Sequence, residues 1–345
     1  MDEEARRGDA LPIGVVVPTR NCRSDLPSHL ASMRPWLGRV REVVVVDSFS
    51  EDGTLEWMQD HLRHVRVSFL SHPPGLYPSW NAAIRHIRSP FTYISTIGDA
   101  VKPEGLEALF VAAEKLRVDV VISPPELTDR GGRAMLKTWP IHELLSGMGF
   151  REPCVLHPAV TFLCAASFIP AGILGSSASN LYRTTMLQAC PFAEDMGHGG
   201  DVAWGIENSV RARFGILPET VSKFVVHSNT RDVPWGRHRR NPYPRLLESM
   251  DRAFSELVPV LEALPTTGVR KRDIQEAAEE LSGLLSRRIS ARVMLKDYRR
   301  RGRPWILNPG AWRARARQKK CASKIREFRS VRLMKICRQM QAVSS

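Results

Sequence analysis

The chain has 345 residues, and 43% of them are hydrophobic, which is enough to bury a sizeable core in one large domain or two ordinary ones. Its formal net charge of +14 is uneven: residues 286–345 hold 19 Lys and Arg against Asp297 and Glu327, and the remaining chain balances to −3. The excess charge thus belongs to one C-terminal segment, so it does not indicate a nucleic-acid-binding fold.

Cysteine spacing and hydropathy exclude further classes. The six cysteines form no C-x-x-C pair, which argues against a zinc site and a disulfide scaffold and favours a cytoplasmic setting. The first ten residues lack the apolar segment of a secretory signal. The longest apolar stretch, 160–174, is interrupted by Pro170 and Gly172. We expect this stretch to be buried core or a loop that lines a pocket. The alternative is a segment that touches a membrane.

The first hundred residues alternate between apolar runs and helical patterns. We expect strands at 13–17, 43–46, 65–70 and 91–96, with helices from 24 or 25 to 37, at 55–62 and at 77–87. Such a series predicts a parallel sheet whose polar strand ends meet at one edge: Thr19, Asp47, Asn81 and Asp99. No G-x-G-x-x-G and no P-loop motif is present.

Asp99 is the acidic residue that closes the run 93–99, and a polar turn and a helix follow it. Ligands of open α/β sheets bind at the carboxyl ends of strands. We therefore expect Asp99 to hold a divalent metal bound to a nucleotide diphosphate. The alternative is that it caps the following helix. Asp47 also has a purely structural interpretation, in which it forms the turn at the end of its strand.

The second half is less regular. A helix at 105–116 and a strand at 118–122 precede a loose, proline-containing stretch, 124–158, which we expect to border a second substrate. The glycine-rich segment 191–208 opens a helix at Asp201 or just before it, and a last strand covers 224–227. Two helices, 244–264 and 271–288, then lead into the basic tail.

Five motifs in this order resemble those of the family 2 glycosyltransferases. They are V-V-V-P-T-R-N (15–21), V-V-V-V-D-S-F-S-E-D-G-T (43–54), Y-P-S-W-N-A-A-I (77–84), I-G-D-A-V-K-P (97–103) and G-D-V-A-W (200–204). The likeness covers roughly residues 11–230. It implies an inverting enzyme of the GT-A (Rossmann-like) α/β fold that uses a nucleotide-diphospho-sugar.

The resemblance also implies roles for single residues. Asp201 corresponds to the catalytic base, with Glu194 and Asp195 as nearby rivals. Asp99 and His227 correspond to metal contacts, for Mn²⁺ or Mg²⁺. The implied nucleotide-binding residues are Pro18, Thr19, Asn21, Asp47, Asp52, Asn81 and Gly98. For the acceptor we expect contacts from Ser179, Asn180 and Trp204.

The chain departs from the family pattern near Asp99. Ile97 stands where a first aspartate of the D-x-D motif is usual, and one carboxylate alone holds a hard divalent cation weakly. Because of this departure, an alternative stays open: the domain is a degenerate, non-catalytic module, and the basic tail binds membrane or nucleic acid. A nucleotidyltransferase is a further alternative, although no G-G-x-G-type phosphate loop follows the first strand.

The basic tail interleaves Arg and Lys with apolar residues. Ile325, Phe328, Arg329, Arg332 and Ile336 fit a basic amphipathic helix, which predicts contact with an anionic membrane surface. One alternative is that the tail is solvated or disordered. Another, less favoured, is that it binds RNA.

The sequence therefore predicts four regions: an N-terminal tail (1–10), a GT-A domain (11–235), a helical extension (236–285) and a basic tail (286–345). Within the GT-A domain, 11–123 would bind the nucleotide sugar and 124–235 the acceptor. We expect a UDP-sugar donor and a glycan or lipid-linked acceptor. The expected location is the cytoplasm, with the tail at the inner face of the membrane.

Overall fold

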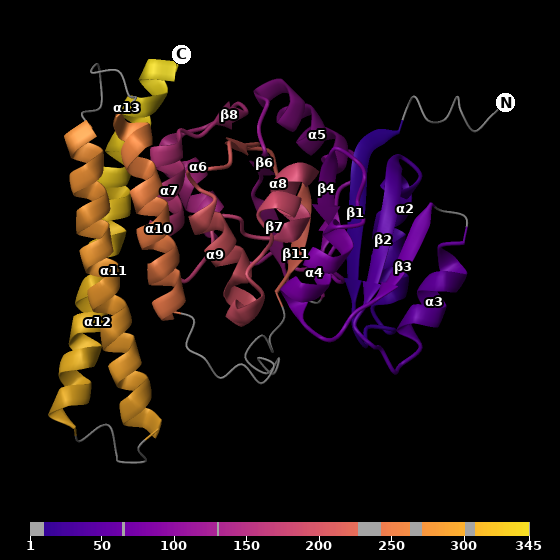
Figure 1. The fold of residues 1–345 in the computed structure, drawn as a ribbon, viewed down its shortest axis with the longest axis horizontal. Coiled ribbons are helices and arrows are strands. Elements are labelled where there is room, and N and C mark those ends of the chain that lie inside the picture. Colours follow the sequence, from indigo (N-terminus) through magenta and orange to yellow (C-terminus); the bar gives the residue numbers. More distant parts are fainter. Residues whose placement is uncertain are drawn as a thin grey trace.

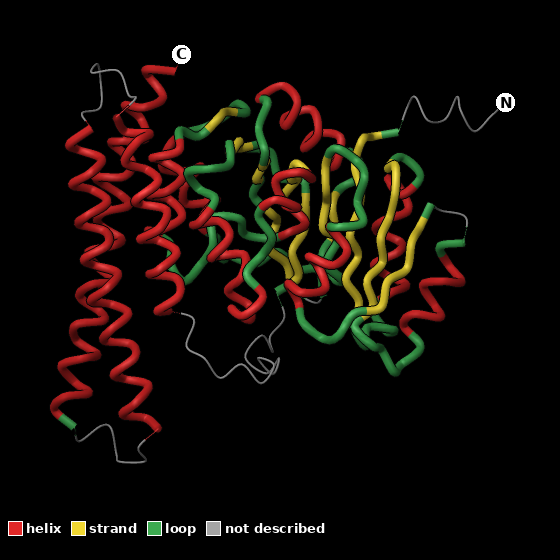
Figure 2. The backbone as a smooth tube through the Cα atoms, viewed as in Figure 1, coloured by secondary structure: helices red, strands yellow, loops and turns green. Residues whose placement is uncertain are grey.

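The computed structural model describes residues 10–63, 66–129, 131–226, 243–262, 271–300 and 308–344. A sheet and its covering helices form one part of the molecule, and a bundle of long helices lies beside it (Figure 1). The tube view separates the strand-rich part from this helical part (Figure 2).

The main sheet has eight strands in the order β3-β2-β1-β4-β9-β6-β10-β8. Their bounds are β1 Leu11–Thr19, β2 Val40–Asp47, β3 Val67–Ser71, β4 Phe91–Ile94, β6 Val120–Ile122, β8 Cys154–Val155, β9 Asn180–Arg183 and β10 Phe214–Ile216. The first four strands are mutually parallel, as predicted, whereas β9 is antiparallel to both β4 and β6. A small second sheet has the order β5-β11-β7, with β5 at Ala100–Val101, β7 at Pro125–Thr128 and β11 at Ser222–Val225.

The valine runs of β1 and β2 are buried on both sides of the sheet. Val15 and Val17 point into a core formed with α2 and α5, while Val16 packs into the larger core on the opposite face. Continuous β-branched runs are typical of parallel strands covered by helices on both faces. The prediction of such a sheet is confirmed.

Helices cover both faces of this sheet. Those of the first two thirds of the chain are α2 Leu26–Leu37, α3 Thr54–His61, α4 Leu76–Ile84, α5 Gly105–Leu116, α6 Pro140–Met148, α7 Pro158–Ser167, α8 Thr184–Ala189 and α9 Gly200–Glu207. Every residue of α7 from Ala159 to Ser167 is buried. A helix that is apolar all round belongs in a core, so residues 160–167 of the apolar stretch are core and not a membrane contact, whereas Pro170 and Ala171 after the helix are exposed. None of the described helices is long and apolar enough to cross a membrane.

The C-terminal helices pack against the sheet domain. They are α10 Tyr243–Glu262, α11 Lys271–Arg300, α12 Pro309–Glu327 and α13 Met334–Ser344, with a π-helical turn at Phe328–Leu333 between the last two. Helix α11 runs unbroken across the boundary at residues 285 and 286 that the charge distribution suggested.

The apolar face predicted for the tail is covered by protein. Ile325, Phe328 and Ile336 are each at most 3% exposed and belong to the same core as the sheet residues. The Arg329 guanidinium lies 4.4 Å from the ring centroid of Phe168 and donates to the Ser167 carbonyl at 3.0 Å. The described part of the tail is therefore a docked helical layer, and the alternative of a disordered tail does not hold for it.

Candidate active site

The loops after β1 and β2 are joined at the carboxyl edge of the sheet. Thr19 donates to Asp47 Oδ1 at 3.0 Å, and the backbone N–H of Ser50 donates to Asp47 Oδ2 at 2.8 Å. The Ser50 hydroxyl donates to Asp47 Oδ1 at 2.6 Å and accepts the N–H of Asn21 at 2.9 Å. Asp47 thus forms a turn, as its structural interpretation predicted. By joining Thr19 to Ser50 it also holds the loops after β1 and β2 together, at the edge where a ligand would bind.

Asp52 closes a second turn at the start of α3. Its carboxylate accepts the Thr54 hydroxyl at 2.6 Å and the N–H of Arg23 at 3.0 Å. Gly53 has φ 80°, a left-handed conformation that glycine adopts without a steric penalty. This explains the D-G-T sequence, and the bond from Arg23 ties Asp52 to the loop after β1, where the Asn21 side chain accepts the N–H of Glu51 at 2.9 Å. Pro18, at the end of β1, is half-buried next to this edge.

Asp99 lies beyond the end of β4, in the turn that leads into β5. It is 6% exposed, and its carboxylate accepts the N–H of Val225 at 3.3 Å and the Ser176 hydroxyl at 3.4 Å. Burial raises the pKa of Asp99 to about 7, although both hydrogen bonds lower it. The alternative that Asp99 caps the next helix is excluded, because α5 begins at Gly105 with Glu104 as its N-cap.

A divalent metal needs more ligands than Asp99 provides. Such cations take about six oxygens, and among the described residues no group of three or more His, Cys, Asp or Glu side chains is placed to hold a metal. His227, the second predicted metal contact, lies outside the described residues. The described side chains by themselves do not fit a metal, and we assign no step of the reaction to one.

Asp201 lies in the first turn of α9, next to the beginning of α4. Its Oδ1 accepts the N–H of Val202 at 2.7 Å, and the Tyr77 hydroxyl, which donates to the His198 carbonyl at 3.5 Å, lies within reach of the carboxylate. Burial raises the pKa of the Asp201 carboxyl, and the Tyr77 hydrogen bond partly opposes that rise. Gly200 permits this approach, because a Cβ there would lie 2.4 Å from the Tyr77 ring. The N-cap of α9 is Gly199, so Asp201 is not the cap.

The rival carboxylates near Asp201 are engaged elsewhere. Asp195 forms an ion pair with Arg245 at 2.9 Å, and Glu194 accepts the Asn81 side-chain amide at 3.0 Å. Asn81 also exchanges two hydrogen bonds with the backbone of Phe192. Because its amide is fully used in joining α4 to this segment, Asn81 is held by protein contacts and not turned toward the β1 and β2 loops.

The three residues predicted to contact an acceptor are buried. Ser179 and Asn180 are 0% exposed and Trp204 is 1% exposed. Ser179 shares a hydrogen bond with Ser222, and Trp204 donates to the Cys190 carbonyl. In this structure their side chains are enclosed by protein contacts. The sequence around these residues gave no signal of their burial, since burial depends on the packing of β9 and α9.

Sequence reasoning missed three partners of the predicted residues: Tyr77 at Asp201, Ser50 at Asp47 and Ser176 at Asp99. Tyr77 and Ser50 lie within motifs noted above, yet nothing local identifies them as partners. Gly98 has φ 96° and adjoins Asp99, which fits the close backbone approach expected at a diphosphate.

The mainly parallel sheet and the helices that cover it have the arrangement of the GT-A fold. Residues 14–169 match the model of glycosyl transferase family 2. This match confirms the family predicted from the motifs for this segment: residues 14–169 form a family 2 glycosyltransferase region, and the protein is a glycosyltransferase. None of the curated proteins matches it.

Several solved structures are similar to this one at low sequence identity. TarS 1–349 from S. aureus in complex with UDP-GlcNAc is 16% identical, covers 92% of this chain and 91% of its own, and has a TM-score of 0.51. TarS 1–349 is 14% identical, with 92% and 90% coverage and a TM-score of 0.50. Glucosyl-3-phosphoglycerate synthase from Mycobacterium tuberculosis in complex with Mn²⁺, UDP and glucosyl-3-phosphoglycerate is 19% identical, with 77% and 85% coverage and a TM-score of 0.41.

Proposed function

We propose that this enzyme transfers a sugar from a nucleoside-diphosphate donor to a hydroxyl acceptor with inversion, and that Asp201 is the general base. The observation that carries the proposal is the Asp201 carboxylate, which is oriented by Tyr77 and whose pKa is raised by burial. A base with a raised pKa accepts a proton more readily at neutral pH.

In the proposed reaction, Asp201 removes the proton of the acceptor hydroxyl as its oxygen attacks the anomeric carbon. The bond between this carbon and the donor diphosphate breaks on the opposite side, so the configuration inverts and the nucleoside diphosphate leaves. The Tyr77 hydroxyl holds the carboxylate in position. A positioned base of this kind contributes about 10²–10⁴-fold to the rate.

We place the nucleoside against the joined loops after β1 and β2, at Pro18, Thr19, Asn21, Asp47 and Asp52. The diphosphate would then lie toward Gly98 and Asp99. A uridine nucleotide is favoured, since the similar fold of TarS was solved with UDP-GlcNAc. A glycan or lipid-linked acceptor remains our proposal for the second substrate.

A panel of nucleotide sugars tests the function. We expect one UDP-sugar to raise the melting temperature and to release UDP when an acceptor is present, with the product anomer inverted by NMR. The panel is run with and without Mn²⁺ or Mg²⁺. Thermal shifts without release by any acceptor would support a non-catalytic module, and turnover of a nucleoside triphosphate with a sugar phosphate would support a nucleotidyltransferase.

We also propose that α12 contacts an anionic membrane surface at the cytoplasmic face. Arg313, Arg317, Lys320 and Lys324 recur at three- and four-residue spacing and so lie on one side of the helix. The last three line a hollow of about 440 Å³ between α11 and α12. They have no hydrogen bond or ion pair within the part of the chain that the structure describes. Trp312, 61% exposed, lies at the start of the same helix.

Vesicles test this surface. Replacing Arg317, Lys320 and Lys324 by Glu should weaken binding to phosphatidylserine vesicles by about 10²-fold, since each basic residue near an anionic surface contributes about 1 kcal/mol. The control replaces Arg34, Arg41 and Arg85 by Glu, which changes the charge equally on the sheet domain. Equal losses in both triple variants would show that net charge alone attracts the protein and would contradict a specific surface on α12.

A further inference from the structure

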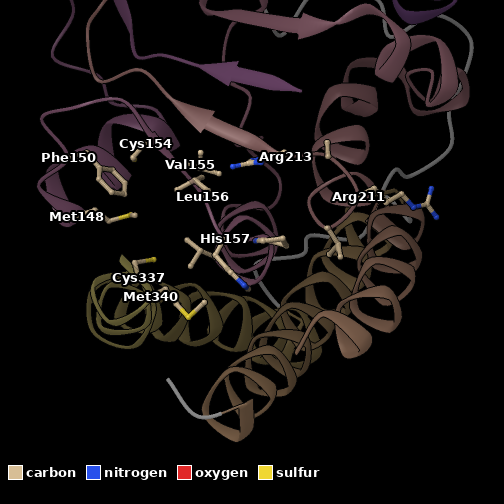
Figure 3. A pocket seen from close by; sticks show the side chains of 14 residues that line it. Met148, Phe150, Cys154, Val155, Leu156, His157, Arg211, Arg213, Cys337 and Met340 are labelled. Atoms are coloured by element: carbon tan, nitrogen blue, oxygen red, sulfur yellow. The ribbon is translucent and has the colours of Figure 1, made fainter. Parts of the chain in front are cut away.

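A cavity among the described residues lies away from the candidate active site. It has a volume of about 800 Å³ and lies between α6, β8, the start of α7, the residues before β10, and α13 (Figure 3). Strand β10 runs parallel to β6 and in the same direction as β1, so the residues that precede it lie at the amino edge of the sheet. The cavity is therefore at the opposite edge from the loops of Asp47 and Asp52.

Most of the cavity wall is apolar. Figure 3 shows Met148, Phe150 and Leu156 on one side and Cys337 and Met340 of α13 on the other. Phe150 remains half-buried, so apolar surface faces the hollow without a protein partner. Ligand pockets of about 300–1,000 Å³ with such linings bury most of the surface of a small apolar molecule. The two methionines add side chains that adapt to an irregular ligand.

The polar groups of the cavity are cationic or hydrogen-bond donors. Arg211 is held by an ion pair with Glu256, but the guanidinium of Arg213 has no hydrogen bond or ion pair among the described residues. His157 accepts the N–H of Ala159 through Nδ1 at 3.2 Å, which leaves the proton of the neutral ring on Nε2. The lining contains no Asp or Glu. Charge complementarity therefore selects an anionic head group beside Arg213.

We propose that this cavity binds a single-chain amphiphile, with its alkyl chain against the apolar wall and an anionic head at Arg213. Because α13 forms one wall, the bound chain also holds α13 against α6. This site is separate from the proposed transfer reaction and does not depend on it. The head is a carboxylate or a phosphate, and the experiment compares both.

Displacement of dansyl-labelled undecanoic acid from the full-length protein tests the site. We expect dodecanoate and dodecyl phosphate to displace it, with the stronger competitor identifying the head group. Arg213→Gln should weaken the affinity of the two anionic competitors by about tenfold, because a charge-assisted hydrogen bond is lost. The affinity of dodecan-1-ol, which carries no charge, should change by less than about twofold. Cys154→Trp, which fills the cavity from β8, should abolish displacement by all three competitors.

Controls separate this site from charge on the surface and from misfolding. Arg34→Gln removes an exposed cation from α2 and should leave the binding of every competitor unchanged. If Cys154→Trp fails to fold, Val210→Phe fills the same cavity from its other side and should abolish displacement. Unchanged binding in folded Arg213→Gln and cavity-filled variants, or no binding of the probe to the wild type, would overturn the proposal.

Discussion

Asp201→Asn is expected to reduce kcat for sugar transfer by about 10²–10⁴-fold while donor affinity changes by less than about twofold. The amide has nearly the same shape and still accepts the Tyr77 hydroxyl, but it cannot take a proton from the acceptor. Single-turnover transfer and isothermal titration with the UDP-sugar measure the two quantities. Asp195→Asn is the matched control, because Asp195 forms its ion pair with Arg245 in the adjoining segment. Full turnover of Asp201→Asn would rule out this base.

The pH profile provides a second readout for the same residue. Asp201 acts only when ionised, so the rate should fall as the pH drops through a pKa above that of an ordinary Asp. Tyr77→Phe removes a hydrogen bond that lowers this pKa, and the acid limb should therefore move to higher pH. A Tyr77→Phe variant with lower activity but an unmoved acid limb would show that Tyr77 only supports the fold.

Asp99→Asn is expected to raise the free energy of unfolding at pH 8 by on the order of 2 kcal/mol in the absence of metal. Burial raises the pKa of Asp99 to about 7. The folded protein therefore binds more protons than the unfolded chain between about pH 4 and 7, and stability falls as the pH rises through this range. Urea unfolding at pH 5 and pH 8 measures the change, and the variant should gain less than half as much at pH 5 as at pH 8.

The same variant tests the predicted metal contact. If Mn²⁺ with UDP engages Asp99, the pair should raise the melting temperature of the wild type more than that of Asp99→Asn. Ser50→Ala is the control, since Ser50 lies at the nucleotide edge and contacts Asp47. Equal shifts in the wild type and Asp99→Asn would exclude Asp99 as a metal contact.

Much of the sheet was predictable because its signals are local. The valine runs of β1 and β2, the polar residues that follow them and the D-G-T turn each express a rule that acts within a few residues. The helix opening at Gly200 and the parallel order of the first four strands were also confirmed. The motif order then led to the family before any contact was known.

The sequence by itself determined the fold class, the family and the acidic positions at the carboxyl edge. Only the tertiary structure decided that Tyr77 orients Asp201, that Trp204 is buried behind it, and that the apolar face of the tail packs on α7. The physical reason is that amphipathic periodicity shows which face of a helix avoids water but not what covers that face. Contacts between residues far apart in the chain are fixed by how the layers pack, and no local pattern records them.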